Sequence, residues 1–533
     1  MPKKVLLIVV DALTSRVFVP ALEAGRFPNL GRIAGAGWLR PDCISIFPSI
    51  TPAATAAIIT GGYPCRTGIT GAYYYNLDTE EVHFYGDDLW VILREGIGNF
   101  FEDFLVQLNR DNLRIETLFD QVESAHRRTA CLNYLWFHGP VGHKVHVPWS
   151  LRVLPGVPFS EKVQGPTILY LGDLVTTELE LTGHTLASKG GMKHRYGFED
   201  QVTADVLVQL AEKGPLPDFT VAYFPDNDYQ SHDVGPEKAL ATIDDLDAAL
   251  GRLIACWGSV EAMLDEVAVV LVADHSQSDL VEDVKQRGIE LDMLLDGFEI
   301  VAAGKGWSSD DELMICTNIR AAQIYLRRGY WPRVGEIVDK LLADKRMDQV
   351  LWREPSAPED APRYRVATAD RGTLEFALSG EGPQSATDEY GGRWSWTGDL
   401  RCVDGRADES GILRFGDYPN AFERIATAFD HEVSGDLWIT AQPGYEFQFE
   451  AIAVHQAGAH GSLHALDSVV PLLVAGAPGE LRFEHTPRTI DVAGLCLQIL
   501  GLPVPIFPGM SHADCVESTR EYRERRKKTP GQP

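Results

Sequence analysis

Four apolar runs stand out along the chain, and none of them alternates with polar residues. They cover residues 5–10, 219–224, 267–273 and 469–475, and Asp, Gly or Pro stands at one or both ends of each. Short continuous runs of this kind are typical of strands buried on both faces of a sheet. We therefore predict four buried strands.

Helical patterns lie between these runs. The clearest covers residues 236–256, where apolar residues recur at the spacing of one helix face behind Pro236, a residue suited to the first helical turn. Strand, helix and strand in this rhythm predict an α/β fold with a parallel sheet. Open sheets of this kind bind ligands at the carboxyl ends of their strands, so catalytic side chains are expected at that edge.

Two regions interrupt this rhythm. Residues from about 77 to 214 mix aromatic, Gly and Pro segments. Residues 291–434 contain one helical stretch, 334–342, followed by a Gly- and Asp-rich part that is typical of hairpins and loops. We interpret both regions as α+β insertions that cap an α/β core formed by residues 1–290 and 435–518.

The composition shows that the chain is acidic. Its 533 residues include 48 Lys+Arg and 76 Asp+Glu, which leaves a formal net charge of −28. This charge argues against binding of nucleic acid or membrane through a broad basic surface, so an anionic substrate has to be held locally by a metal or a pocket. Residues 519–533 form a basic segment, which we expect to be a disordered tail.

The start of the chain and its cysteines predict a cytoplasmic protein. Asp11 ends the first apolar run after six residues, which is too short for the apolar part of a signal peptide. No later stretch is apolar enough to span a bilayer. The eight cysteines are dispersed without a C-x-x-C motif, which indicates neither a zinc ribbon nor a dense disulfide framework and leaves one disulfide open.

Two candidate catalytic residues lie in the first part of the chain. Asp11 follows the first strand directly, where a carboxylate either binds a metal or caps the next turn. Thr51, Pro52 and Gly61 delimit a helix, with Thr51 expected at the N-cap and Pro52 at the first helical position. The Thr51 hydroxyl either closes this helix or attacks a phosphorus atom whose oxygens rest on the free amides of its first turn.

Three further places carry residues that bind divalent metals. Asp228 and His232 follow the second predicted strand at a spacing of four, which on a helix brings a carboxylate and an imidazole to one metal and otherwise allows a surface hydrogen bond. Asp274 and His275 end the third strand, and His460 lies with two other histidines in a stretch of ten residues. Their joint occurrence near strand ends indicates one site.

Taken together, these residues resemble the alkaline phosphatase superfamily, and most closely its nucleotide pyrophosphatase/phosphodiesterase branch. Five motifs occur in the family's order, which is more specific than any one of them. They are Val10-Asp11-Ala12, residues 47–51 with 60–64 and 68–69, Asp228-x-x-x-His232 with Gly235-Pro236, Ala273-Asp274-His275, and His460-Gly461. The resemblance implies an alkaline phosphatase-like core, with a mostly parallel sheet flanked by helices.

The resemblance also implies roles for these residues. Two metal sites are implied, the first formed by Asp228, His232 and His460 and the second by Asp11, Asp274, His275 and the oxygen of Thr51. Two zinc ions are the family default, and manganese or iron could occupy the same ligands. Thr51 would be the nucleophile and would form a phospho-threonine intermediate that water then hydrolyses.

The sequence departs from the branch close to the nucleophile. Ala72 stands where the branch commonly has an Asn that contacts the transferred phosphoryl group, so this contact is either missing or made by Asn76. Tyr73 and the two tyrosines after it either line a substrate pocket or form an alternating, half-buried strand. Residues 52–54 carry no aromatic side chain, so a preference for nucleotides is not supported.

The predicted activity is metal-dependent hydrolysis of phosphate esters, with phosphodiester or pyrophosphate bonds first. A phosphomonoesterase and a phosphonate hydrolase are the enzymatic alternatives, and a catalytically silent metal-binding member is the non-enzymatic one. The partner would be a small phosphorylated or phosphonate molecule, and the oligomeric state stays open. The chain contains no G-x-S-x-G, G-x-x-x-x-G-K-[ST] or H-E-x-x-H motif, so these rival catalytic signatures are absent.

Overall fold

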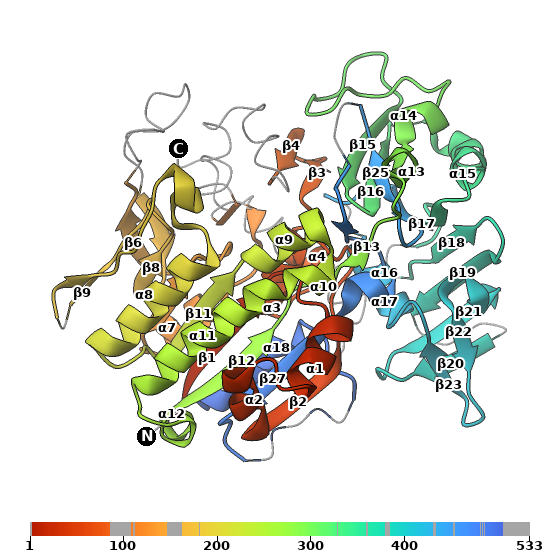
Figure 1. Cartoon of the computed structure of the whole chain (residues 1–533). Helices are drawn as coiled ribbons and strands as arrows, with labels where there is room; N and C mark the ends of the chain where they lie inside the picture. Colours follow the sequence, from red (N-terminus) through yellow and green to blue (C-terminus); the bar gives the residue numbers. More distant parts are fainter. Residues whose placement is uncertain are drawn as a thin grey trace.

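Two sheets organise the chain. The computed structural model describes residues 3–85, 108–109, 112–146, 162–180, 182–327, 329–358, 361–378, 384–429, 433–450, 454–479, 481, 483 and 485–504. A seven-stranded central sheet lies in one part of the molecule, and a ten-stranded second sheet lies beside it (Figure 1). The predicted basic tail at 519–533 falls outside the described residues.

The central sheet contains all four predicted strands. In spatial order it consists of β2 (Gly37–Ile44), β27 (Val469–Ala475), β12 (Val267–Val272), β1 (Lys4–Val10), β11 (Phe219–Phe224), β5 (Thr129–Leu132) and β8 (Ile168–Tyr170). β1 lies near the middle and pairs in parallel with β11 and β12. The fold is therefore an α/β fold with a mostly parallel sheet, as predicted.

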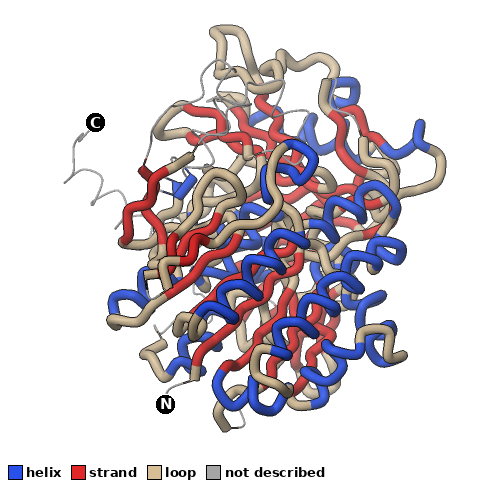
Figure 2. Tube along the Cα trace, turned by 60° about the vertical axis from the view of Figure 1, so that its left-hand side comes forward, coloured by secondary structure: helices blue, strands red, loops and turns tan. Residues whose placement is uncertain are grey.

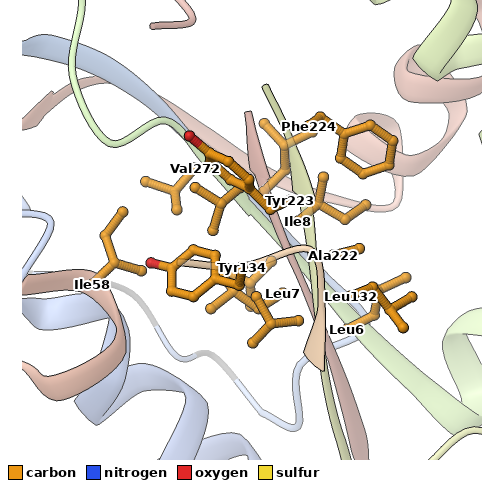
Figure 3. Packing of buried hydrophobic residues seen from close by; sticks show 14 of the residues in the cluster. Leu6, Leu7, Ile8, Ile58, Leu132, Tyr134, Ala222, Tyr223, Phe224 and Val272 are labelled. Carbon is orange, nitrogen blue, oxygen red and sulfur yellow. The ribbon is translucent and has the colours of Figure 1, made fainter. Parts of the chain in front are cut away.

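The apolar side chains of β1 explain why this sheet forms the core. Residues 5–10 are all at most 1% exposed. Ile8 lies on the same face as Ala222 of β11 and Leu132 of β5, and Leu7 lies on the other face, toward Tyr134 and Ile58 (Figure 3). Burying a side chain of this size contributes about 1.5–3 kcal/mol, so a strand buried on both faces is a strong stabilising element.

Helices cover the central sheet (Figure 2). One group consists of α2 (Pro28–Gly35), α8 (Asp200–Lys213) and α11 (Ala241–Ala255), where α11 contacts both others. Another consists of α3 (Thr51–Thr60), α7 (Leu118–Ser124) and α18 (Asp491–Leu500), where α18 contacts both others and β1. The helix predicted over 236–256 is divided at Leu240 into α10 (Pro236–Ala239) and α11.

The direction of β27 accounts for the antiparallel part of the mostly parallel sheet. β27 runs antiparallel to both β12 and β2. The reason is that the chain enters β27 through the short helix α17 (Ala465–Ser468), without a crossover helix that would return it to the opposite edge. The amino end of β27 therefore lies at the carboxyl edge of the parallel strands.

Residues 77–214 are not only a capping insertion. They contain β5 and β8, which extend the central sheet beyond β11, and the helix α8, which packs on it. These strands have four and three residues, so neither is long enough to show a distinct hydrophobic period. The same region contains the strands β4 (Glu81–Phe84), β6 (Val141–Lys144), β7 (Lys162–Gly165), β9 (Glu178–Leu179) and β10 (His184–Thr185).

The second sheet is built mostly from residues 313–415. Its order is β15 (Leu313–Asn318), β16 (Ala321–Leu326), β24 (Leu437–Ala441), β17 (Met347–Arg353), β18 (Tyr364–Thr368), β19 (Gly372–Leu378), β21 (Arg393–Gly398), β20 (Gln384–Asp388), β23 (Ile412–Phe415) and β22 (Gly405–Ala407). It extends past the expected boundary at 434, because β24 lies between β16 and β17. The predicted helix is α15 (Val334–Leu342), whereas α16 (Ala421–Ala428) was not expected.

Shorter elements connect these layers. They are α1 (Ser15–Glu23), α4 (Pro64–Thr67), β3 (Tyr73–Asn76), α9 (Asp226–Val234), α12 (Val260–Glu266), β13 (Ser278–Asp279), α13 (Val284–Arg287), β14 (Gly288–Glu290), α14 (Leu291–Leu294), β25 (Glu446–Gln448) and β26 (Gly458–Ala459). Among the described residues, no helix is long and apolar enough to cross a membrane. Cys65 is disulfide-bonded, whereas the six other described cysteines are free.

Candidate metal centre

The first cluster of possible metal ligands forms where α9 meets the loop before β27. Asp228 and His232 lie one turn apart on α9, with Asp228 Oδ1 3.3 Å from His232 Nε2. His460 Nε2 lies 3.6 Å from the same Asp228 oxygen. The helical alternative for this segment is therefore the one that the chain adopts, and His460 reaches the site because β27 is antiparallel.

The second cluster lies at the carboxyl ends of β1 and β12. His275 Nε2 is 3.3 Å from Asp11 Oδ1 and 3.6 Å from Asp274 Oδ2. All three residues are at most 4% exposed. In each of the two clusters, the potential ligand atoms lie within 4.8 Å of one another, which is close enough for a single metal ion.

Thr51 lies beside the second cluster, at the start of α3. It is the first residue of the helix, with Ile50 at the N-cap, so the expected position is wrong by one residue. Thr51 Oγ1 lies 3.0 Å from His275 Nε2. The hydroxyl therefore points to the cluster instead of closing the helix. Gly61 ends the helix in the left-handed conformation, as predicted.

The three imidazoles are oriented by backbone carbonyls. The Nδ1 atoms of His232, His275 and His460 lie 2.9, 3.1 and 2.9 Å from the carbonyl oxygens of Gly458, Ser276 and Ser49. Because a carbonyl only accepts, each Nδ1 donates and each Nε2 is directed to the clusters. This is the usual arrangement of a metal-binding histidine.

The carboxylates fit a metal for a different reason. Among the described residues, one oxygen each of Asp11, Asp228 and Asp274 is buried without a hydrogen-bond partner, and all three belong to the two clusters. An unpaired buried carboxylate oxygen is costly, and a divalent cation would satisfy it. Imidazole nitrogens combined with carboxylate oxygens suit Zn²⁺, Mn²⁺ or Fe.

The charges of the second cluster raise the pKa of its members. Burial, and after it the neighbouring carboxylates, raises the pKa of Asp11 and, more strongly, that of Asp274. Burial alone would lower the pKa of His275, but Asp274 and Asp11 outweigh it and raise this pKa to about 10. Without metal, the imidazole therefore carries a proton that compensates the carboxylates.

The first cluster behaves differently. Burial would raise the pKa of Asp228, but the neighbouring histidines, His232 first, hold this pKa below its usual range. Burial and the charge of His275 hold the pKa of His460 well below its usual value. The rings of His275 and His460 stack with centroids 3.8 Å apart, so the two clusters are in direct contact.

Two polar residues that sequence reasoning missed support Asp11. The hydroxyl of Tyr223 donates to Asp11 Oδ2, and Asn227 Nδ2 donates to the Asp11 carbonyl oxygen at 2.9 Å. Tyr223 lies within the apolar run of β11 and Asn227 lies next to Asp228. A tyrosine in a buried strand carries no sequence signal for such a bond, because its partner is more than 200 positions away.

The residues considered for substrate contact lie in different places. Ala72 is buried in an apolar cluster with Ile50, the residue before Thr51. Tyr73 and the two tyrosines after it form β3 and are all at most 4% exposed, so this strand is buried and not half-buried. Asn76 Oδ1 accepts hydrogen bonds from the backbone N–H groups of Asp78 and Thr79 in the β3–β4 turn. This oxygen is therefore engaged in the turn and not directed to Thr51.

The sequence profile of the type I phosphodiesterase / nucleotide pyrophosphatase family matches residues 5–463, a span that includes Thr51 and both clusters. The chain belongs to this family. Membership makes it a metal-dependent hydrolase of phosphate esters, and it confirms the family that the ordered motifs indicate. No curated protein sequence matches the chain.

Two solved hydrolase structures share the fold of this chain at low sequence identity. Murine ectonucleotide pyrophosphatase / phosphodiesterase 5 is 15% identical with a TM-score of 0.54, and the match covers 95% of this chain and 98% of the murine one. Phosphonoacetate hydrolase from Sinorhizobium meliloti 1021, in complex with phosphonoformate, is 17% identical with a TM-score of 0.55. That match covers 94% of this chain and 96% of the other.

Proposed function

We propose that this chain hydrolyses phosphodiester or pyrophosphate bonds of a small molecule, with Thr51 as nucleophile. The observation that carries the proposal is the position of Thr51 Oγ1, 3.0 Å from His275 Nε2, beside two clusters in which each carboxylate has one buried oxygen without a hydrogen-bond partner. Asp228, His232 and His460 would hold one divalent ion and Asp11, Asp274 and His275 a second, both proposed to be zinc.

The first turn of α3 supports this role. Ala54 is the first residue whose N–H bonds within the helix, to the Ile50 carbonyl at 2.9 Å, and Pro52 has no N–H. The N–H groups of Thr51 and Ala53 therefore have no acceptor inside the helix. A phosphoryl group at Thr51 Oγ1 would accept hydrogen bonds from them, at the positive end of the helix dipole.

The reaction would proceed in two displacements. The Thr51 oxygen would form a bond to phosphorus while the bond from phosphorus to the leaving oxygen breaks, which yields a phospho-threonine. Water would then attack the same phosphorus and release Thr51 and phosphate or a phosphomonoester. Bound divalent ions would supply a lowered pKa for the attacking hydroxyl and neutralise negative charge on the oxygens. The residues of the chain position these groups.

The test compares bis-p-nitrophenyl phosphate with p-nitrophenyl phosphate on protein of measured metal content. We expect a preference for the diester, and loss of activity in Thr51→Ala with metal content unchanged. Thr60→Ala is the control, because Thr60 is another threonine of α3 but its hydroxyl donates to the Ala56 carbonyl. Equal activity of Thr51→Ala and wild type would refute the nucleophile, and a monoester preference would favour a phosphomonoesterase.

A phosphonate hydrolase is the second candidate. One solved structure with this fold is a phosphonoacetate hydrolase bound to phosphonoformate, and another is an inactive murine phosphodiesterase variant in complex with AMP. Ala72 is buried in an apolar cluster with Ile50, the residue before Thr51, so it offers no polar group to a nucleotide there. Release of phosphate from phosphonoacetate, with both nitrophenyl esters inert, would favour this candidate.

A further inference from the structure

The second sheet reaches the proposed metal centre through one tight turn. Residues 318–320 connect β15 to β16, and the Arg320 N–H donates to the His460 carbonyl at 2.9 Å. Gly461 packs against this turn so closely that a Cβ atom there would lie 2.6 Å from the Asn318 carbonyl oxygen. The turn therefore touches the backbone of a proposed metal ligand from outside the central sheet.

The Asn318 side chain binds a different loop. Its Oδ1 accepts the N–H groups of Ala72 and Tyr73 at 2.8 and 3.2 Å, and its Nδ2 donates to the Tyr73 carbonyl at 2.9 Å. Asn318 is fully buried. It holds the start of β3 against the same turn that touches His460.

Arg320 supports the loop after His460. This arginine is fully buried and forms an ion pair with Asp467 Oδ1, which is also fully buried. The other oxygen of Asp467 accepts the Ser462 N–H at 2.9 Å and the Ser462 hydroxyl at 2.6 Å. The Arg320 guanidinium therefore supports the loop at Ser462, two residues beyond His460, through the Asp467 carboxylate.

The same guanidinium supports the segment before His460. Arg320 Nη1 donates to Ser278 Oγ at 2.8 Å, and the Ser278 hydroxyl donates to the Ala459 carbonyl at 3.1 Å. Arg320 Nη2 donates to the Ala441 carbonyl at 2.9 Å, on β24 of the second sheet. Both sides of His460 are thus connected to the second sheet by one planar side chain.

Ile319, between Asn318 and Arg320 in the turn, has an unusual backbone conformation. Its φ is 58°, in the left-handed region that β-branched residues rarely adopt. Its side chain is 5% exposed in an apolar cluster whose other members are Ile50, Ala72, Leu280 and Ala459. Ile50 precedes Thr51 and Ala459 precedes His460, so Ile319 belongs to the same apolar cluster as both segments that carry these residues.

We propose that the turn Asn318-Ile319-Arg320 is a positioning element for the metal centre, which sets the placement of His460 relative to Thr51. The inference rests on the proposed function, because it assumes that His460 binds a metal. The second sheet is then a part of the site's framework as well as a cover. Arg320 and Ile319 are positioning residues, since neither belongs to the ligand clusters.

Arg320→Lys tests the ionic part of this proposal. A lysine keeps the charge but cannot bond Ser278, Asp467 and the Ala441 carbonyl with one planar group. We expect zinc affinity at one of two sites to fall about 10- to 100-fold, as is typical when a residue supporting a ligand is replaced. The measurement is zinc competition with a chromophoric chelator, together with the melting temperature of the zinc-free protein.

Arg371→Lys is the matched control for this variant. Arg371 also pairs with a buried carboxylate, that of Asp348, and it donates a hydrogen bond to the Tyr418 hydroxyl. It contacts neither Thr51 nor any residue of the two clusters. We expect a lower melting temperature of the zinc-free protein in both variants and weaker zinc binding only in Arg320→Lys. Equal zinc affinity of the two variants would overturn the positioning role while the proposed function stands. Wild-type protein that binds no zinc would overturn the proposed function itself.

Ile319→Gly provides a test that changes no charge. Glycine adopts the left-handed conformation without strain, so the fold is retained, but the apolar contact with Ile50 and Ala459 is lost. We expect weaker zinc binding and a lower kcat at saturating zinc. The melting temperature of the zinc-free protein should also fall, because the relief of backbone strain offsets only part of the lost apolar contact. Wild-type zinc affinity and kcat in this variant would contradict the proposal.

Discussion

Asp274→Asn is expected to have opposite effects on the zinc-free and the zinc-loaded protein. Asp274 is fully buried, and its Oδ1 accepts the N–H groups of Ala12 at 3.2 Å and His275 at 2.9 Å. The amide oxygen of asparagine can keep both bonds. The other oxygen has no partner, and leaving such a group buried costs about 1–3 kcal/mol. The substitution removes a buried negative charge without removing the bonds that Asp274 makes.

The sign of the zinc-free effect follows from the pKa. Burial, and after it Asp11, holds the pKa of Asp274 well above its usual value in the folded protein. The folded state therefore binds the proton more tightly than the unfolded state, so this residue lowers stability progressively as the pH rises above about 4, the unfolded pKa. At pH 8 the asparagine variant without zinc should be as stable as wild type or more stable.

With zinc bound, the variant should be less stable than the wild type, because the variant lacks a proposed ligand. At a free zinc concentration 100 times the dissociation constant, each occupied site adds about 2.7 kcal/mol to the free energy of unfolding. The variant should lose this gain at one site. Urea denaturation at pH 8, with a chelator and then with zinc, measures both effects.

The control for this experiment is Asp348→Asn. Asp348 is also a buried carboxylate with a raised pKa, caused first by burial, but it pairs with Arg371 away from both clusters. Its substitution should destabilise the protein equally with and without zinc. If Asp274→Asn shows this same equal loss in both conditions, the assignment of Asp274 to a metal site is wrong.

Three further predictions follow from the site and the core. Tyr223→Phe removes the hydroxyl that donates to Asp11 Oδ2, and zinc affinity or activity should fall about 10- to 100-fold, measured by competition and hydrolysis with the fold monitored by circular dichroism. His275 has a pKa of about 10 without metal, so zinc must displace its proton, and zinc affinity should rise between pH 6 and 8; a flat profile would contradict this. Leu7→Ala in the fully buried centre of β1 should lower the free energy of unfolding by about 2–5 kcal/mol, measured by urea denaturation, and a loss below 1 kcal/mol would contradict the packing.

Much of the central sheet could be predicted from the sequence. The apolar runs at 5–10 and 219–224 are long enough to identify strands buried on both faces, and both are central strands of the sheet. The start signal of α3 was wrong by one residue, and its end signal, Gly61, was right. Ligand-type residues at strand ends could be found because parallel strands bring their carboxyl ends to one edge.

Other parts of the fold depend on contacts that leave no local pattern. β5 and β8 have few residues, and they are strands because β11 offers an unpaired edge. The helix α16 lies among aromatic side chains of the second sheet, and all eight of its residues are buried, including Glu423 and Arg424. The sequence does not indicate that these charged residues are buried, because their surroundings come from distant parts of the chain. Asn76 remained a substrate candidate because its use in a turn depends on how β3 pairs with β4.

The sequence by itself determined the family, the α/β class and the set of ligand-type residues, because these depend on residue order and on local hydrophobic periods. Only the tertiary structure decided how they meet. The antiparallel direction of β27 brings His460 to the edge where Asp228 lies, and the turn at Ile319 packs against the segments before His460 and Thr51. Chain direction and packing across hundreds of positions are set by which surfaces bury one another, and this information is carried by no single segment of the chain.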